Sequence, residues 1–378
     1  MVAGEPSGDL LAARVMQGLQ ALAPAVQVSG IGGPHMTAQG LQAWYPMDTL
    51  AIFGYVDALK RLPSLLAMRR NVIRRWLKQR PDVFVGIDAP DFNLGVEERL
   101  RSAGIPTVQF VGPSIWAWRG ERIHLIRRAV SHMLVVFPFE EALYQEAGVP
   151  VTYVGHPLAS VIPLEPDQSA ARARLQVDAR ARVVALMPGS RTSEIARMGP
   201  TFIRAAGLLQ KRNPRLEFLV PMVNEERRRQ FLSLPGLDAV QRLRCITGRA
   251  YDVLEACDAV LVASGTASLE AALFKRPMVI AYAVSPLALW IMRKRSGQER
   301  PYVPWVGLPN VLAREFLVPE LLQTDMTPEA LADALWPMLE DAKRVEALKI
   351  RFAELHQVLR RDTARLAASR ILEVARGA

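Results

Sequence analysis

The fold is decided by two stretches of the chain, VVALMPGSRTSE at residues 183–194 and AVLVASGTASLE at residues 259–270. Each begins with apolar residues, two of them β-branched valines, that do not alternate with polar ones, which is typical of a strand buried on both faces of a parallel sheet. Each strand ends in small residues that we expect to open a helix. Unpaired backbone N–H groups and the positive end of the helix dipole meet at such a point, so both loops are candidate phosphate sites.

The residues of these loops predict how a nucleotide binds. The loop residues are Gly189, Ser190, Arg191, Ser264, Gly265, Thr266 and Ala267. A guanidinium at Arg191 can clamp a diphosphate with two hydrogen bonds, and Glu270 can accept hydrogen bonds from ribose hydroxyls. Neither loop has the spacing of a Walker P-loop or a GxGxxG fingerprint. The alternative is that both are ordinary strand-to-helix turns capped by Ser or Thr.

Composition indicates a folded enzyme of two domains, because 378 residues, half of them hydrophobic and 22% charged, exceed what a single core usually supports. The start shows no secretory signal, and Ser285-Pro286 divides the most apolar stretch, so we read no transmembrane segment. Two cysteines without metal-ligand spacing fit a reducing compartment. The five histidines are scattered, so the sequence predicts neither a metal site nor a cofactor.

The formal net charge of +10 predicts an anionic partner. Between Asp57 and Asp82 there is no acidic residue, and apolar residues recur at helical spacing among the basic ones. The basic face and its neighbouring tryptophan are Arg69, Arg70, Arg74, Arg75 and Trp76. Such a helix can lie on an anionic membrane surface. Alternatively it packs on a sheet through its apolar stripe and leaves its arginines solvated. No nucleic-acid motif accompanies the charge.

The alternation of apolar strands and amphipathic helices predicts an α/β fold of two doubly wound, Rossmann-like domains that face a central cleft. The expected strands are 1–3, 26–28, 83–87, 107–111, 133–137, 183–187 and 259–263, with others near Leu216, Cys245 and Met278. We expect a helix from Leu10 and a glycine-rich turn at Gly30–Pro34. Because the first strand is so short, we expect the natural chain to begin a few residues upstream.

Closely spaced prolines after Gly155 mark the domain linker. We therefore expect domains at 1–160 and 161–349, with a C-terminal helix from about 350 to 378 that packs back on the first domain. The helices beyond Pro328 could exchange between two copies, so the sequence is compatible with a homodimer.

Six motifs form an ordered set along nearly the whole chain. They are AGEPSGD at 3–9, VGIDAPDFN at 85–93, PSIWAWR at 113–119, PGSR at 188–191, ASGTA at 263–267 and LPN at 308–310. Together they resemble the lipid-A-disaccharide synthases, glycosyltransferases of the two-domain GT-B type. The segment Arg295–Val306 is longer than that pattern leads us to expect, so its role stays open.

The resemblance implies a hexosyltransferase of lipid A and lipopolysaccharide biosynthesis. UDP-2,3-diacylglucosamine would donate its sugar to the 6-hydroxyl of 2,3-diacylglucosamine 1-phosphate with inversion, giving a β(1→6) disaccharide 1-phosphate and UDP. We expect a cytoplasmic enzyme, peripheral on the inner face of the bacterial inner membrane. Acyl-chain length and type are not encoded in any motif that we read.

Inversion needs a base on the acceptor and stabilised charge on the leaving diphosphate. The family's catalytic aspartate falls on Asp88, at the carboxyl end of a predicted buried strand. Asp91, Ser7 and Asp9 are candidate acceptor contacts, although Asp91 and Ser7 can equally cap helices. The resemblance places Asn310 against the donor sugar or phosphate; the alternative is a turn residue after a proline. Without an Asp-x-Asp motif, the arginine and amides of the nucleotide loops would neutralise the diphosphate.

Two other functions stay open. A UDP-N-acetylglucosamine 2-epimerase shares the two-domain fold, but it would have little use for the basic amphipathic segment. A non-catalytic, nucleotide-binding membrane module would leave Asp88 without a task.

Overall fold

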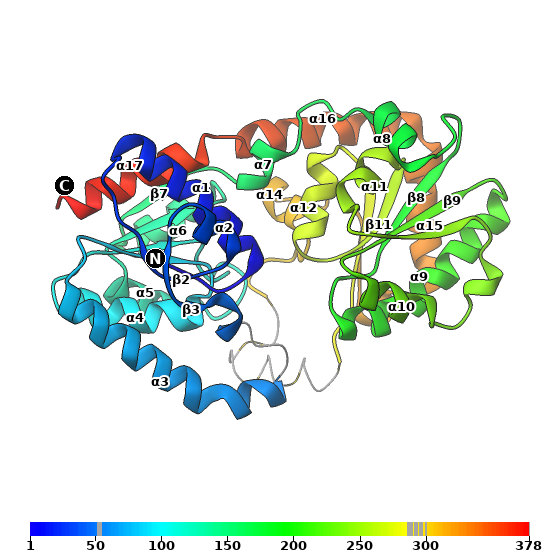
Figure 1. Cartoon of the computed structure of the whole chain (residues 1–378). Helices are drawn as coiled ribbons and strands as arrows, with labels where there is room; N and C mark the ends of the chain where they lie inside the picture. The colour runs from blue at the N-terminus through cyan, green and yellow to red at the C-terminus, as the bar shows by residue number, and fades with distance from the viewer. Residues whose placement is uncertain (51–54, 286–289, 291–293, 295–297, 299–300, 378) are drawn as a thin grey trace. The chain divides into compact units, whose positions relative to one another are not determined.

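The computed structural model describes residues 1–50, 55–285, 290, 294, 298 and 301–377, and it divides into two compact units (Figure 1). Unit 1 comprises Met1–Ser160 together with Leu359–Ala378, and unit 2 comprises Val161–Val358. The chain therefore leaves unit 1 once and returns to it near the C-terminus. Part of the segment Arg295–Val306, namely 295–297, 299 and 300, lies outside the described residues.

Within the described residues, unit 1 is built on a seven-stranded parallel sheet in the order β3-β2-β1-β4-β5-β6-β7. The strands are β1 (Val2–Ala3), β2 (Ser29–Gly32), β3 (Gln42–Pro46), β4 (Phe84–Ile87), β5 (Thr107–Phe110), β6 (His132–Val135) and β7 (Val151–Tyr153). The helices are α1 (Pro6–Leu22), α2 (Pro34–Ala38), α3 (Tyr55–Gln79), α4 (Pro90–Ser102), α5 (Ile123–Ala129), α6 (Glu140–Glu146), α7 (Pro157–Val161) and α17 (Thr363–Ala375). The strand order reverses between β1 and β4, so the loops that follow these two strands are neighbours at the carboxyl edge.

Helices cover both faces of this sheet, with α3 and α4 on one side and α1 and α17 on the other (Figure 1). Helix α17 comes from the end of the chain and packs along α1. The contact is close, because a Cβ on Gly18 of α1 would lie 2.8 Å from the carbonyl oxygen of Ala364. The last helix is thus an integral layer of the N-terminal unit.

Helix α3 packs on the sheet through one apolar stripe. Its residues Met68, Val72 and Trp76, four apart, are buried in one cluster with Phe84. The ring of Trp76 lies 4.9 Å from that of Phe84 and is 2% exposed. The prediction that Trp76 contacts a membrane is therefore wrong, because the indole fills the core of unit 1.

The basic face of α3 remains accessible. The side chains of Arg70, Arg74 and Arg75 are exposed, whereas Arg69 is half-buried. The Arg75 guanidinium lies 3.9 Å from the centre of the Trp44 ring, an arrangement that attracts a cation to an aromatic face. The alternative that α3 packs on a sheet is therefore correct for its apolar stripe. The exposed arginines remain available to a partner.

Several element boundaries differ from the sequence prediction. The predicted turn at Gly30–Pro34 overlaps strand β2, where Gly30, at φ 143°, passes so close to β1 that a Cβ would lie 2.0 Å from the Met1 carbonyl oxygen. Helix α1 begins at Pro6 instead of Leu10. The edge strands β3 and β7 were not predicted, since they are short and only partly buried.

Within the described part of unit 2, six parallel strands follow the order β10-β9-β8-β11-β12-β13. The strands are β8 (Val183–Met187), β9 (Glu217–Met222), β10 (Leu243–Thr247), β11 (Ala259–Ala263), β12 (Met278–Tyr282) and β13 (Glu320–Leu322). The helices are α8 (Gln168–Leu175), α9 (Thr192–Arg212), α10 (Glu225–Leu232), α11 (Ala250–Ala256), α12 (Thr266–Leu273), α14 (Leu308–Ala313), α15 (Pro328–Glu340) and α16 (Ala342–Leu359). The order reverses between β8 and β11, so the two glycine-containing loops predicted to bind nucleotide are neighbours at one edge.

Among the helices that the structure describes, none is both long enough and apolar enough to cross a bilayer.

Candidate active site

The reversal point of the unit 1 sheet holds Asp88, the first residue after β4. Its backbone is left-handed, with φ 50°, and so is that of Ala89, with φ 37°. Two contacts fix the residue: its N–H donates to the Phe110 carbonyl at 3.0 Å, and its Oδ1 accepts from the Gly4 N–H at 2.9 Å. Because Gly4 follows β1, the two central strands of the sheet jointly hold the carboxylate.

The second carboxylate oxygen of Asp88 lies against the first turn of α1. A Cβ on Gly8 would be 1.7 Å from this Oδ2, so only glycine leaves the space that the oxygen occupies. Oδ2 is buried and has no hydrogen-bond partner within the described structure. One oxygen of Asp88 is therefore held by Gly4, and the other makes no hydrogen bond within the described structure.

Burial raises the pKa of Asp88 from its ordinary value to about 7. The backbone N–H groups of Gly4 and Glu5 oppose this shift, and the nearby charge of Glu5 adds to it. A carboxylate that titrates near neutrality is a far better base than an ordinary aspartate, because the best general base has a pKa near the working pH.

Two buried amides support the strained backbone at Asp88. Its carbonyl oxygen accepts from Asn93 Nδ2 at 3.0 Å and from Gln109 Nε2 at 3.1 Å. Left-handed residues other than glycine persist only where their surroundings hold them. Sequence reasoning assigned no task to either amide, or to Gly4 and Gly8, although all but Gln109 lie inside the motifs that carry the resemblance.

Asp9, predicted to contact the acceptor, has a structural task instead. Its carboxylate is 1% exposed and accepts from the backbone N–H groups of Gly33, His35 and Met36 at 2.9, 2.9 and 3.0 Å. The side chain thereby caps the N-terminus of α2. We therefore leave Asp9 out of the candidate acceptor site.

Ser7 and Asp91 both remain accessible. Ser7 is exposed in the first turn of α1, whose N-cap is Glu5. Asp91 lies in the first turn of α4, whose N-cap is Ala89, and its side chain is 81% exposed and pairs with Arg122 at 2.7 Å. The capping alternatives for both residues are wrong, and their contacts with an acceptor stay predictions.

The loop after β8 is already bound to an acidic side chain. Glu194 Oε2 accepts from the N–H groups of Ser190 at 3.0 Å and Arg191 at 3.1 Å. Gly189, at φ 116°, makes room for it, since a Cβ there would lie 2.5 Å from the same oxygen. The Arg191 side chain is 69% exposed and lies 3.3 Å from Glu194 Oε1. The guanidinium is thus open to a diphosphate, whereas the two loop amides are engaged.

The loop after β11 presents the N-terminus of α12. Gly265, at φ 138°, is the N-cap, and both Gly265 and Thr266 are exposed, with Ala267 half-buried. The Ser264 hydroxyl donates to the Val306 carbonyl at 3.2 Å, so it anchors a neighbouring segment. Neither nucleotide loop is capped by a Ser or Thr side chain, so the simple capped-turn alternative is wrong.

Glu270 lies farther along α12 and is half-buried. It accepts a hydrogen bond from the Tyr251 hydroxyl at 3.3 Å, at the edge of the usual range. Burial raises the pKa of Glu270 to about 7, and the tyrosine hydroxyl opposes that shift. Glu270 is therefore not the solvated acid of an ordinary first helical turn.

Asn310, predicted to contact the donor, is fully buried in α14. Its Nδ2 donates to the Val318 carbonyl at 2.9 Å and to Glu320 Oε1 at 2.8 Å, and its Oδ1 accepts from the Val318 N–H at 2.9 Å. Glu320 also accepts from the N–H groups of Val306 and Gly307. The amide therefore organises this loop, and the prediction of a direct donor contact is corrected to a positioning role. Asn310 lies within helix α14, so the alternative that it is a turn residue is also wrong.

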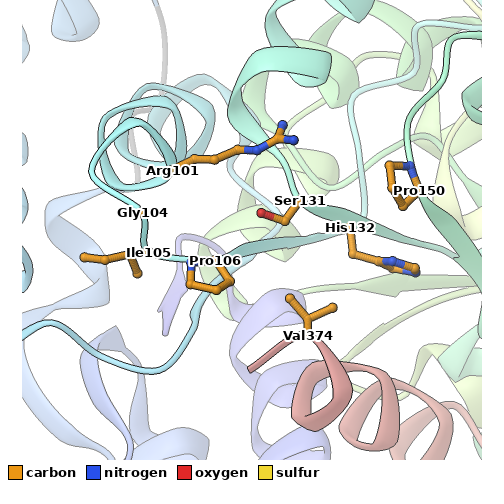
Figure 2. Close-up of a pocket in the computed structure, with 8 residues that line it drawn as sticks. All are labelled: Arg101, Gly104, Ile105, Pro106, Ser131, His132, Pro150 and Val374. Atoms are coloured by element: carbon orange, nitrogen blue, oxygen red, sulfur yellow. The ribbon is translucent and has the colours of Figure 1, made fainter. Parts of the chain in front are cut away.

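Unit 1 also contains a cavity of about 420 Å³ (Figure 2). Its lining residues lie at the amino ends of β5, β6 and β7, the edge of the sheet opposite Asp88. Figure 2 shows Arg101, Ser131 and His132 on its walls. The Arg101 guanidinium donates to two backbone carbonyls at 2.7 and 2.6 Å, and burial lowers the pKa of His132 to about 4. With its cation engaged and its histidine neutral, this cavity is separate from the candidate site. Among all the residues that the structure describes, no group of three or more His, Cys, Asp or Glu side chains could hold a metal ion.

A family model described as lipid-A-disaccharide synthetase matches residues 1–374. The chain belongs to the lipid-A-disaccharide synthase family. The synthase of Bordetella parapertussis is 61% identical over 386 residues, covering 100% of this chain and 98% of that protein. The synthase of Aromatoleum aromaticum is 52% identical over 374 residues, covering 98% and 94%. A solved UDP-GlcNAc 2-epimerase from Neisseria meningitidis, bound to UDP-GlcNAc, aligns with a TM-score of 0.58 at 11% identity, covering 98% and 97%.

Family membership makes this chain a glycosyltransferase enzyme of lipid A biosynthesis, with two parallel sheets that match GT-B structures. The family implies UDP-diacylglucosamine and diacylglucosamine 1-phosphate as substrates. At 11% identity the likeness to the epimerase shows the fold alone. We therefore drop both alternative functions, the UDP-N-acetylglucosamine 2-epimerase and the non-catalytic membrane module.

Proposed function

We propose that Asp88 is the general base of an inverting transfer from UDP-2,3-diacylglucosamine to the 6-hydroxyl of 2,3-diacylglucosamine 1-phosphate. Asp88 Oδ2 takes the hydroxyl proton as the new bond from O6 to the anomeric carbon forms. The bond from that carbon to the diphosphate oxygen breaks, and UDP leaves with the electron pair. The observation that carries the proposal is the buried, unpartnered Oδ2 of an aspartate whose pKa is raised to about 7.

In this proposal the loops of unit 2 hold the nucleotide. The exposed guanidinium of Arg191 and the N-terminus of α12 at Thr266 and Ala267 stabilise the charge that develops on the diphosphate. Glu270 accepts hydrogen bonds from the ribose, and it is supported by Tyr251. The Glu194 carboxylate already occupies the amides of Ser190 and Arg191, so an incoming diphosphate competes with it for these donors.

We also infer that the enzyme is peripheral on the inner face of the inner membrane, because diacylated sugars leave a bilayer reluctantly, at about 0.8 kcal/mol per buried CH₂. Support comes from the exposed arginines 70, 74 and 75 on α3 and from the net charge of +10. Trp76 is no longer part of this surface. The homodimer stays a prediction.

The experiment that tests the assignment measures UDP release with and without acceptor. We expect strict dependence on diacylglucosamine 1-phosphate. Asp88→Asn should lose about 10²–10⁴ in turnover and still bind UDP like the parent, since the base acts on the acceptor.

Asp333→Asn on α15 is the matched control, because this carboxylate is 66% exposed, pairs with Arg212 and belongs to no predicted site, so turnover should stay parental. UDP release without acceptor would refute the transfer reaction. Near-parental turnover of Asp88→Asn would move the base to another residue.

A further inference from the structure

A group of buried acceptor oxygens lies beneath Asp88. Gln109 Oε1, Asn93 Oδ1 and both carboxyl oxygens of Glu97 are buried and have no hydrogen-bond partner in the described structure. All three side chains are 0% exposed. Buried polar groups are normally paired, so a cluster of acceptors without a donor requires an explanation.

The fold brings these side chains together from two elements. Asn93 and Glu97 are four residues apart on α4, so they share a helix face. Gln109 is on β5, in register with Gly86 of β4. A Cβ on Gly86 would lie 2.5 Å from both Gln109 Oε1 and Glu97 Oε1, so these two oxygens are neighbours in the space that this glycine leaves free.

The orientation of the Gln109 amide is fixed by its other end. Its Nε2 lies within hydrogen-bonding distance of three backbone carbonyls, those of Asp88 at 3.1 Å, Phe110 at 3.3 Å and Val111 at 3.0 Å. Only the nitrogen of an amide can donate, so the oxygen must face Glu97. An ionised Glu97 would then place a buried charge against another acceptor, at a high cost in free energy.

A proton on Glu97 resolves the conflict, because a neutral carboxyl has one O–H donor. Burial raises the pKa of Glu97 well above its ordinary value, which keeps that proton in place. The neutral acid can thus supply the donor that the amide cluster lacks.

We propose that Glu97 is a positioning residue for Asp88, whose protonated carboxyl donates a hydrogen bond to Gln109 Oε1 and so holds Gln109 Nε2 on the Asp88 carbonyl. The inference rests on the proposed role of Asp88 as the base. The left-handed backbone at Asp88 and Ala89 needs this support to keep the Asp88 carboxylate in its orientation. Without the donor, Gln109 can turn its amide and release the carbonyl.

The test compares two substitutions of similar size in the full chain. Glu97→Gln keeps an N–H donor, so turnover should stay within about threefold of the parent. Glu97→Met has no donor, so kcat should fall on the order of 10- to 100-fold, as misplaced catalytic groups do, while the KM for the donor and the UDP affinity stay unchanged. If Glu97 had only a structural role, Glu97→Met would lower the melting temperature, and kcat would not fall selectively while KM stays unchanged.

The results that overturn the inference are clear. Parental kcat in Glu97→Met, or equal losses in the Met and Gln variants, would show that the donor has no role. Where Glu97→Met does not fold, Gln109→Met decides in the same assay, and full activity there overturns the support role. Inactive Asp88→Asn beside active Glu97→Met refutes only the positioning, whereas active Asp88→Asn refutes the base itself.

Discussion

Replacing Gly8 by alanine tests the geometry around Asp88 most directly. The new Cβ would lie 1.7 Å from Asp88 Oδ2, whereas ordinary van der Waals contact begins at 3.4 Å. The two atoms must therefore move apart by a further distance of about 1.7 Å. The atom in conflict belongs to the carboxylate whose other oxygen is held by Gly4. A displacement of about 1 Å at a catalytic group costs on the order of 10²-fold in rate, so we expect kcat to fall by about that factor or more.

Stability should change much less than activity in this variant. Overpacking costs about 1–3 kcal/mol, and alanine regains up to about 1 kcal/mol over glycine inside a helix. The matched control is Gly207→Ala in α9, where the nearest atom to a new Cβ is 3.9 Å away. Steady-state UDP release, calorimetry with UDP and thermal melts distinguish the effects. Parental kcat in Gly8→Ala would refute the placement of the Asp88 carboxylate.

Four further outcomes follow from the site. Because the base acts only when ionised and the Asp88 pKa is raised to about 7, kcat/KM should fall tenfold per pH unit below about pH 7 and level off above it; a profile flat down to pH 5 would contradict the assignment. Arg191→Ala should weaken UDP binding by about 1.5 kcal/mol, or roughly tenfold, and unchanged affinity by calorimetry would remove this arginine from the diphosphate site. Glu194→Gln keeps a side-chain acceptor for the loop amides but loses the negative charge, so UDP affinity should rise several-fold; weaker binding would mean that the carboxylate serves the ligand. Binding to anionic vesicles should weaken by about 1 kcal/mol per charge, with strong salt dependence in the parent, when glutamine replaces the exposed arginines of α3; equal flotation at low salt would make them solvent-facing only. These are Arg70, Arg74 and Arg75.

The strands that flank the nucleotide loops were predictable because a buried parallel strand needs an unbroken apolar run, and residues 183–187 and 259–263 have one. Strand β2 was missed because glycines at 30, 32 and 33 read as a turn, whereas here Gly30 permits close approach to β1. The stripe of α3 was ambiguous for a different reason. Apolar spacing is the same whether a helix lies on a sheet or on a membrane, so only the fold could place Trp76 in the core.

The polar residues of the site were harder to predict than the strands. The hydrogen bonds of Asp9 end on residues at least 24 positions away, and nothing in the sequence shows that its carboxylate is fully used. The same holds for Asn310, whose partners become visible only when β13 is placed. Asp88 was found through the resemblance, yet its support by Glu97 and Gln109 depends on a register between β4 and β5 that no motif records.

The return of the chain to unit 1 at Leu359 has a consequence for biosynthesis. Helix α17, which packs along α1, is made only after the whole of Val161–Val358 has been translated. At about 5–20 residues per second, that interval lasts roughly 10–40 s on the ribosome. During this time α1 lacks its covering helix, and when the interval ends unit 2 is complete while α17 is still to be made. The second unit can therefore finish folding before the first, reversing the usual order in which nascent domains mature.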